Sequence, residues 1–232
     1  WTCLTENYAE VLIINADGTA VSYGVEDGEY WEEVKGNIKT VNNKMTMTFE
    51  DDDNWEGRFE MLTGEAFTIY EENGESFTFN YCKKDLADEI VGMWVCHEGL
   101  PGVENDMAIK TYSEDGKMTM TAPNSTFIPG DFVNQVSDYK VVGDILFKIF
   151  PKENTADKIS CLASRIVYTP NGTSAGDILI EHQYTPSENG TMELTFSFLR
   201  IKQTLDLANK SYNYSANYIS NAKGSDFTIL DY

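Results

Sequence analysis

The segment FTFNYCKKDL at residues 77–86 returns in pattern as LTFSFLRIKQ at residues 194–203. Apolar residues occupy the same three alternate columns in both segments, and a basic residue follows them, Lys83 in the first and Arg200 in the second. Alternation with a period of two indicates a strand with one buried face. The two segments therefore indicate that the same strand occurs twice in the chain.

Three further pairs of segments repeat in the same order. Each pair matches in residue type and spacing; the pairs are Trp1/Cys3 with Trp94/Cys96, residues 15–21 with 113–119, and residues 38–51 with 139–152. Four matches in one order are not a coincidence, so the sequence predicts two copies of one module. We assign the first copy to residues 1–88, the second to 89–202, and a C-terminal extension to 203–232.

Eight runs of β-type residues follow one another in the first copy, at 1–4, 8–14, 19–25, 30–41, 44–50, 55–62, 66–71 and 76–82. Short turns rich in Asp, Asn and Gly separate them, as between antiparallel neighbours. A meander of this length removes its exposed edges by closing into an up-and-down barrel. The predicted fold is all-β, with two tandem eight-stranded antiparallel barrels and room for one helical turn between them.

The second copy is longer than the first, which we assign to loops at 122–131, 151–158 and 170–176. In the extension, residues of one parity are aromatic or small (Tyr212, Tyr214, Ala216 and Tyr218), which predicts an added strand. On the eighth strand of the first copy, the same parity rule predicts that Phe77, Phe79 and Tyr81 point into the barrel.

A Gly-x-Trp sequence (Gly92 to Trp94) opens the second copy, and a basic residue follows the inward aromatic residues of its last strand. Together with the eight-stranded meander, this pattern resembles the lipocalins, and it is similar to the tandem lipocalin-like domains of exported, Bacteroidetes-type bacterial lipoproteins. The resemblance implies that Trp94 and Trp1 close the barrel floors, with Arg200 and Lys83 packed over them in cation–π contacts.

The second barrel is the better place for a ligand. Large inward residues on short strands predict a solid core in the first barrel, because an eight-stranded barrel is only just wide enough for its own side chains or one small molecule. The candidate ligand-binding residues of the second barrel are Trp94, Arg200, Phe196 and Phe198. A carrier of this kind predicts an apolar cavity that opens under the 122–131 loop.

The composition limits the function. The 232 residues carry a net charge of −21, with 41% hydrophobic and 12% aromatic residues, which is typical of a folded domain. So acidic a chain repels phosphate backbones and anionic bilayers, which argues against nucleic acid as a partner. The acidity is concentrated in residues 1–93, with a balance of −15 against −6 for the rest. That region is either a surface for a basic partner or cations, or a solvated face.

Few residues indicate catalysis or metal binding. His97 and His182 are too few for a ligand cluster, and the four cysteines lack the C-x-x-C spacing of zinc and redox motifs. Buried free thiols are the favoured interpretation of the cysteines, with disulfides as the alternative. The acidic run at 50–54 lacks the spacing of a calcium loop and lies where a hairpin turn is needed. Trp31, flanked by acidic residues, is a candidate for an exposed contact surface. The sequence predicts no enzyme, no metal and no cofactor.

Two functions follow from these predictions. The first is a non-catalytic interaction module: an exported, monomeric protein of the cell surface or periplasm, lipid-anchored upstream of residue 1, with an unidentified protein partner. Its export is expected from an all-β composition rich in Thr, Asn and Tyr and from a start at Trp1 in place of Met. No apolar stretch reaches membrane-spanning length. The alternative is a carrier of a small apolar ligand in the second barrel.

Overall fold

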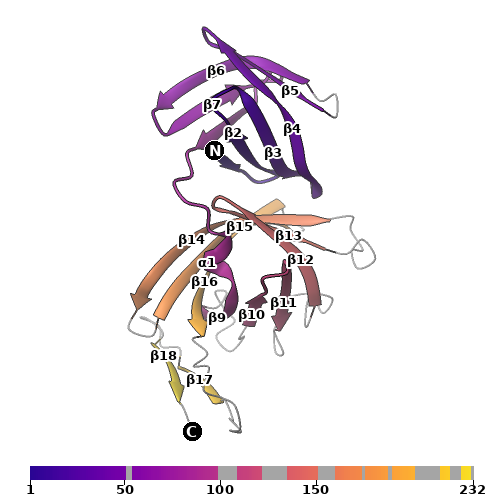
Figure 1. Cartoon of the computed structure of the whole chain (residues 1–232). Helices are drawn as coiled ribbons and strands as arrows, with labels where there is room; N and C mark the ends of the chain where they lie inside the picture. The colour runs from indigo at the N-terminus through magenta and orange to yellow at the C-terminus, as the bar shows by residue number, and fades with distance from the viewer. Residues whose placement is uncertain are drawn as a thin grey trace. The chain divides into compact units, whose positions relative to one another are not determined.

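The protein is all-β apart from one helical turn, α1 (Ala87–Ile90), and contains two closed eight-stranded antiparallel barrels in tandem (Figure 1). The computed structural model describes residues 1–50, 54–98, 109–121, 135–150, 160–173, 176–187, 190–201, 215–219 and 226–230; at some strand ends it describes the backbone alone. The predicted fold class is confirmed, and so is the helical turn in the connector. None of the helices in these ranges is long and apolar enough to cross a membrane.

The first barrel is a simple meander in which each strand pairs with the next. Its strands are β1 (Thr2–Leu4), β2 (Tyr8–Ile14), β3 (Thr19–Glu26), β4 (Glu29–Val41), β5 (Lys44–Phe49), β6 (Asn54–Thr63), β7 (Ala66–Tyr70) and β8 (Ser76–Asn80). The barrel closes where Thr2 of β1 pairs with Asn80 of β8. All eight predicted runs are confirmed as strands, with ends that differ by two residues or fewer.

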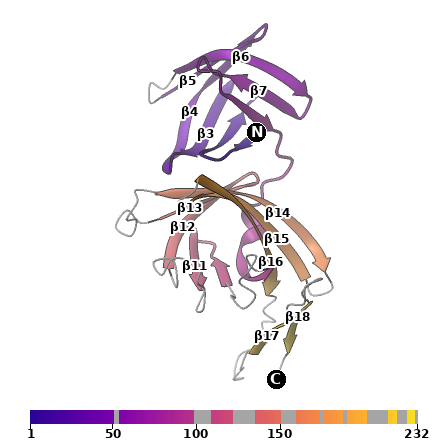
Figure 2. The same ribbon diagram turned by 180° about the vertical axis from the view of Figure 1, so that it is seen from behind.

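The second barrel repeats this order with longer strands near its end, visible from behind in Figure 2. Its strands are β9 (Gly92–Glu98), β10 (Ile109–Tyr112), β11 (Lys117–Thr121), β12 (Gln135–Val142), β13 (Ile145–Ile149), β14 (Cys161–Thr173), β15 (Gly176–Ser187) and β16 (Gly190–Ile201). The barrel closes by antiparallel pairing of β16 with β9. The predicted loops at 122–131 and 151–158 lie outside the described residues. At the predicted loop 170–176, β14 continues to Thr173 and β15 begins at Gly176, and residues 174–175 lie outside the described residues.

Every repeated segment occupies the same place in both barrels. Residues 15–21 join the second strand of the first barrel to its third, and residues 113–119 do the same in the second barrel. Residues 38–51 include parts of the fourth and fifth strands of the first barrel, and residues 139–152 include parts of the fourth and fifth strands of the second. The extension behaves differently. Its strands β17 (Ser215–Ile219) and β18 (Asp226–Leu230) pair with each other in a separate two-stranded sheet, not with a barrel.

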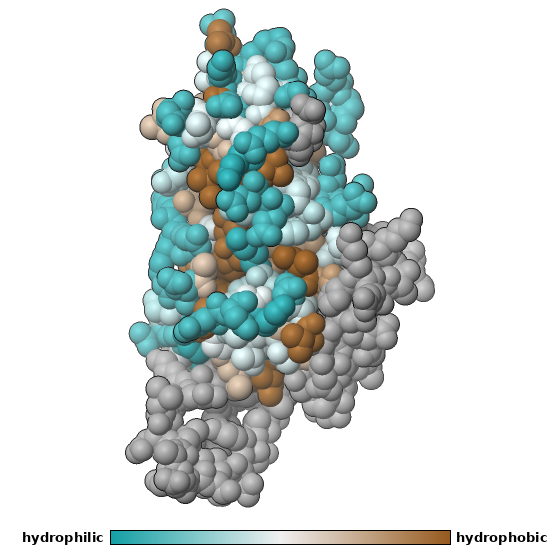
Figure 3. All heavy atoms as spheres, turned by 45° about the vertical axis from the view of Figure 1, so that its right-hand side comes forward, coloured by the Kyte–Doolittle hydropathy of each residue, from teal (hydrophilic) through white to brown (hydrophobic). Residues whose placement is uncertain are grey.

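The chain divides into two compact units whose limits differ from those of the barrels. The first unit comprises Trp1–Ala87, Lys140–Arg165 and Gln183–Glu193; the second comprises Asp88–Tyr139, Ile166–His182 and the chain from Leu194 onward. On the face shown in Figure 3, hydrophilic side chains cover most of the described surface, with smaller apolar patches between them. This distribution agrees with the high charge of the sequence.

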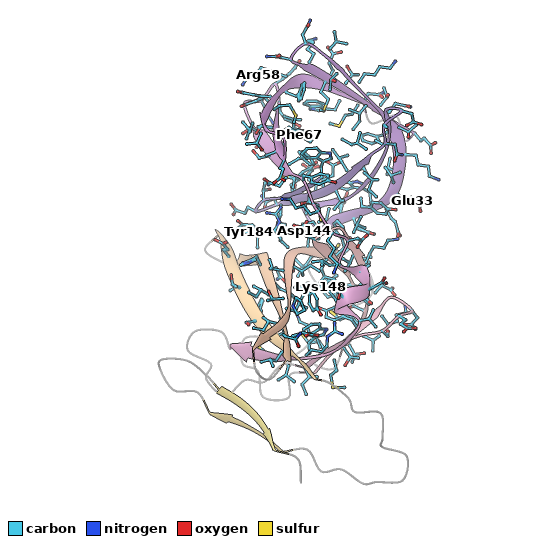
Figure 4. The ribbon with its side chains drawn as sticks, turned by 60° about the vertical axis from the view of Figure 1, so that its left-hand side comes forward. Glu33, Arg58, Phe67, Asp144, Lys148 and Tyr184 are labelled. Atoms are coloured by element: carbon cyan, nitrogen blue, oxygen red, sulfur yellow. The ribbon has the colours of Figure 1, made fainter. Side chains whose placement is uncertain are left out.

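The interior of the first barrel is an apolar core built from alternate residues of its strands. Its fully buried members are Cys3, Leu12, Ala20, Ile38, Met45, Met47, Phe67, Ile69 and Phe79. Phe67 stacks on Phe79, with the two ring centroids 5.1 Å apart and the ring planes inclined by 8°. Figure 4 shows Phe67 inside this barrel, whereas Arg58 lies on the outside. The prediction of a filled first barrel agrees with this core.

Tyr81 departs from the predicted pattern. Phe79 is completely buried, as alternation predicts, but Tyr81 is 51% exposed. The reason is that β8 ends at Asn80, so the alternation of inward and outward side chains no longer applies at residue 81. The prediction that Tyr81 points into the core is wrong.

The first unit has a second core, on the opposite face of β2 and β3. Side chains of these two strands pack there against side chains of β13, of β14 and of Val142 at the end of β12: Ala9, Val11, Tyr23, Val25, Val142, Ile145, Phe147, Cys161 and Ala163. This explains why β2 carries four consecutive buried residues where a strand with one wet face would alternate. Both faces of β2 are buried within the unit.

Gly24 on β3 provides a test of the packing inside the first barrel. It lies opposite Trp31 of β4, and a Cβ added at Gly24 would overlap the Trp31 ring. We expect Gly24→Ala to lower the free energy of unfolding by about 1–3 kcal/mol, as overpacking does, measured by urea unfolding. Gly64→Ala is the matched control, since no atom lies within 4 Å of its added Cβ. Equal losses in the two variants would contradict the predicted overlap.

Candidate functional site

The interior of the second barrel contains a cluster of charged and polar side chains, which we call the inner cluster: Lys110, Tyr112 and Glu181. Lys110 and Tyr112 are the buried residues of β10, where they alternate with the half-buried Ile109 and Thr111. Glu181 comes from β15 and is among the largest completely buried side chains of the protein. The pleat of the two strands therefore points these three side chains inward.

Glu181 joins the cluster through both carboxylate oxygens. Lys110 Nζ donates a hydrogen bond to Oε2 over 2.8 Å, and Tyr112 OH donates one to Oε1 over 2.7 Å. The side chains of Lys110 and Glu181 are 7% and 0% exposed. Removing two charges from water costs several kcal/mol per ion, and their mutual attraction offsets this only when the geometry is good. The cluster is thus expensive to bury and carries no net charge.

Aromatic rings complete the surroundings of Lys110. Its Nζ lies 4.4 Å from the ring centroid of Phe198 and 5.6 Å from that of Phe196. Phe198 is buried, while Phe196 is half-buried. An ammonium held over ring faces gains cation–π attraction, which is larger where water is excluded. Two of the four predicted ligand-binding residues, Phe196 and Phe198, therefore lie beside the inner cluster.

Tyr112 stays protonated in this setting. Burial raises the pKa of Tyr112 well above its ordinary value, and the negative charge of Glu181 raises it further. The phenol is accordingly a hydrogen-bond donor to Glu181 and not a base near neutral pH.

The other two predicted residues, Trp94 of β9 and Arg200 of β16, lie opposite each other where the barrel closes, and both contact α1; we call this group the floor. Trp94 is completely buried, and its Nε1 donates a hydrogen bond over 2.7 Å to the carbonyl of Ile90 in α1. The Arg200 guanidinium lies 4.6 Å from the Trp94 ring centroid and donates a hydrogen bond to the carbonyl of Glu89. The cation–π contact implied by the lipocalin resemblance is present here.

Asp177 forms an ion pair with Arg200 of this group and was not predicted. Its Oδ2 lies 3.4 Å from Arg200 Nε and accepts a hydrogen bond from Tyr168 OH over 3.1 Å. Its Oδ1 accepts a hydrogen bond from the backbone N–H of Asn171 in β14 over 2.9 Å. The position of Asp177, directly after a Gly that starts a strand, resembles an ordinary turn residue in the sequence.

A further inward polar group lies on β13, β14 and β15 and was also not predicted. Lys148 donates a hydrogen bond to Gln183 Oε1, to which Ser164 donates another over 3.3 Å. All three side chains are at most 7% exposed, and Figure 4 shows Lys148 inside the second barrel. The interior of this barrel is therefore far more polar than the aromatic pattern of β16 suggested.

The first barrel does not have the predicted arrangement at its floor. Trp1 packs against the rings of Phe67 and Tyr81, with centroids 5.0 Å and 5.3 Å away. Lys83 lies beyond the end of β8; its side chain is 69% exposed and forms an ion pair with Glu65 over 2.8 Å. The hydrogen bond to Glu65 raises the pKa of Lys83. The prediction that Lys83 packs over Trp1 is wrong, for the same reason as at Tyr81.

Trp31 is part of a polar network inside the first barrel. Its Nε1 donates a hydrogen bond over 2.9 Å to Ser22 Oγ, which donates one over 2.6 Å to Glu10 Oε1. Tyr8 OH donates to the second oxygen of Glu10. Glu10 and Ser22 are buried and Trp31 is half-buried, so Trp31 is not the exposed contact residue that its acidic neighbours suggested.

The cysteines are free thiols: Cys3, Cys96 and Cys161 are buried and Cys82 is partly buried. No group of three or more His, Cys, Asp or Glu residues suited to a metal occurs in the described part of the chain. His182 Nδ1 lies 3.0 Å from Thr195 Oγ1. The side chain of His97 lies outside the described residues, as do residues 51–53 of the acidic run.

The thiol of Cys3 gives the stability of the protein an alkaline dependence. Burial raises its pKa from 9.0 to about 12, and the Glu10 carboxylate contributes. The stabilisation is complete below pH 9 and is lost as the pH rises toward 12, because only the unfolded chain then releases the proton. From pH 8 to pH 11, we expect the free energy of unfolding of the wild type to fall by about 2–3 kcal/mol more than that of Cys3→Ala. Urea titrations under reducing conditions measure this, with the partly buried Cys82→Ala as control; equal pH dependence in all three proteins would contradict it.

Comparisons with known proteins assign no family. No protein-family model matches the sequence, and no curated protein matches it. Among solved structures, a porin-like protein from Bacteroides uniformis is similar over 86% of this chain and 94% of that chain, with 11% sequence identity and a TM-score of 0.20. A TM-score this low carries no argument about fold or function. The lipocalin-like relationship remains a prediction from the sequence.

Proposed function

We propose that the chain is a non-catalytic binding protein whose second barrel holds a small molecule. The observation that supports this most directly is the inner cluster beside Phe196. A buried ion pair of Lys110 and Glu181 is costly for a fold to keep, whereas apolar residues of similar volume would pack at least as well. Burial also raises the pKa of Tyr112 in the same cluster, and titratable groups with shifted pKa values concentrate at functional sites.

The contrast between the two barrels supports the same proposal. The first is filled by an apolar core around Phe67 and Phe79, and its inward polar residues Glu10, Ser22 and Trp31 hydrogen-bond to one another, which leaves it the role of a scaffold. The second presents hydrogen-bonding side chains inward, together with a half-buried ring at Phe196. Small-molecule sites commonly combine aromatic walls with a few convergent polar groups. Tyr112 is a donor in this proposal and has no part in proton abstraction.

Native mass spectrometry of protein purified from its own host tests this function. We expect a co-purified small molecule in the wild-type protein and in Val167→Thr, which changes an exposed residue of β14. We expect its loss in Phe196→Ala, which removes the half-buried ring. Wild-type protein that carries no small molecule, and whose thermal stability does not respond to a metabolite extract of the host, would contradict the proposal.

A groove on the first barrel favours an interaction surface as a second candidate function. It has a volume of about 930 Å³ and lies between the β4–β5 hairpin and the outer faces of β6 and β7. The Arg58 guanidinium stacks 3.8 Å above the Tyr70 ring in this groove, and Val41, 68% exposed, lines it. In this second proposal the protein is exported, lipid-anchored and monomeric. Crosslinking of intact cells through a photoreactive residue at Val41 tests it. A partner band that persists when Arg58→Ala is added to the same protein would contradict it.

A further inference from the structure

We infer that the molecule held by the second barrel is a neutral, flat compound with hydrogen-bonding groups, not a hydrocarbon-like cargo. This inference rests on the proposed function and adds the chemical class of the ligand. Three observations carry it: a buried hydroxyl without a partner, a charge-balanced ion pair with donor capacity to spare, and a half-buried aromatic face. The hydroxyl belongs to Ser137, the ion pair is that of the inner cluster, and the aromatic face is that of Phe196.

Ser137 of β12 points into the barrel. Its neighbours Val136 and Asp138 are exposed, whereas Ser137 is 3% exposed. It lies opposite Met118 of β11, which in turn lies opposite Tyr112 of β10, so the three form one row across the inner face of the sheet. Ser137 Oγ has no hydrogen-bond partner among the described residues. A buried hydroxyl left unpaired costs about 1–3 kcal/mol, and such groups are rare in native proteins.

The inner cluster disfavours a charged ligand. A carboxylate brought to Lys110 would lie beside the Glu181 oxygen, which is already 2.8 Å from the ammonium. A cation brought to Glu181 would meet Lys110 in the same way. Like charges at such distances in a poorly hydrated site repel strongly. A neutral group avoids both repulsions, since the pair remains intact when it binds.

The same cluster supplies hydrogen bonds to a neutral group. An ammonium has three donors, and one of those of Lys110 goes to Glu181. Ser137 can donate and accept. A ligand with a carbonyl or amide can therefore satisfy groups that a hydrocarbon would leave buried and unpaired, and a site built to hydrogen-bond discriminates strongly against ligands without the matching group.

The rings of Phe196 and Phe198 indicate that the ligand is flat. Phe196 and Phe198 lie with ring centroids 6.2 Å apart and planes inclined by 36°, and Phe196 keeps part of its surface exposed. Flat rings pack on such faces in offset or edge-on arrangements. A neutral aromatic amide combines the flat body with the polar group, and it is the simplest probe of this class.

Calorimetric titration of the full chain with benzamide, benzoate and toluene tests the inference, because the three molecules share a ring and differ only in the substituent. We expect saturable binding of benzamide, and binding of benzoate and toluene at least tenfold weaker. Ser137→Ala should weaken benzamide about 3- to 10-fold and leave toluene unchanged. Phe196→Ala should weaken all three, and the exposed control Val167→Thr none of them.

Two results would overturn the inference while leaving the proposed function intact. One is tighter binding of toluene or benzoate than of benzamide, weakened by Phe196→Ala. The other is benzamide binding that Ser137→Ala does not change, as expected if the hydroxyl only holds a structural water. If none of the probes binds, the inferred class is wrong; the proposed function fails with it only if wild-type protein from the host also carries no small molecule.

Discussion

Glu181→Leu alone is expected to lower the free energy of unfolding by about 3–5 kcal/mol. The substitution removes the acceptor of two hydrogen bonds and leaves the Lys110 ammonium buried without its counter-charge. It also leaves Tyr112 OH without an acceptor in a completely buried place. The loss should appear as a lower urea midpoint with an unchanged slope.

The triple variant Lys110→Met, Tyr112→Phe, Glu181→Leu measures the net contribution of the whole cluster to the free energy of unfolding. Glu181→Leu alone measures the cost of leaving its partners buried and unpaired. It replaces all three polar groups by apolar groups of similar volume, and we expect a stability equal to or above that of the wild type. The exposed ion pair of Lys44 and Glu56 is the control, since Glu56→Gln should leave the midpoint unchanged. A triple variant as unstable as Glu181→Leu would mean that the cluster stabilises the fold.

A stable triple variant that has lost its ligand would link the cluster to binding. Stability and function then change in opposite directions, which is the behaviour expected where a fold keeps costly groups for a purpose other than stability. The same protein serves as a folded negative control for the ligand experiments, because its backbone and volume are retained.

The fold was predictable because the first barrel is built from local rules. Each strand there pairs with its neighbour in the chain, and turn residues such as Asp17-Gly18 and Asn42-Asn43 mark where the pairs reverse. The repeat then extended the prediction to the second barrel. Strand ends and side-chain faces were less predictable: at Tyr81 and Lys83 the residue pattern continues past the point where β8 stops.

The inner cluster was not predictable from the sequence. Lys110 and Glu181 are 71 residues apart and come from strands that are not consecutive. In the sequence DILIEHQ at 177–183, Ile178 and Ile180 lie on one face, whereas the other face carries two charged residues and a single leucine, which favours the isoleucines as the inward face. The structure buries Asp177, Leu179 and Glu181 completely or nearly so and leaves the isoleucines half-buried. Periodicity identifies the two faces of a strand but not which of them lies inside a polar barrel.

The floor of the second barrel gives the other large expected effect. Trp94→Ala should lower the free energy of unfolding by about 3–5 kcal/mol, as expected for the loss of a completely buried tryptophan. Trp94→Phe should lose less, because it keeps a ring beneath Arg200 and loses mainly the hydrogen bond to the Ile90 carbonyl. Trp55→Phe, a half-buried residue of the first barrel, is the matched control for a Trp-to-Phe change.

A double-mutant cycle with Arg200→Leu and Trp94→Leu measures what the two side chains contribute together. We expect a coupling energy of about 1–2 kcal/mol, because the guanidinium lies 4.6 Å from the ring centroid in a site that excludes most water. Additive losses would show that Trp94 only fills space. Coupling that persists unchanged when ligand is bound would place Trp94 and Arg200 in the floor, beneath the ligand, and leave recognition to Ser137, Lys110 and Phe196.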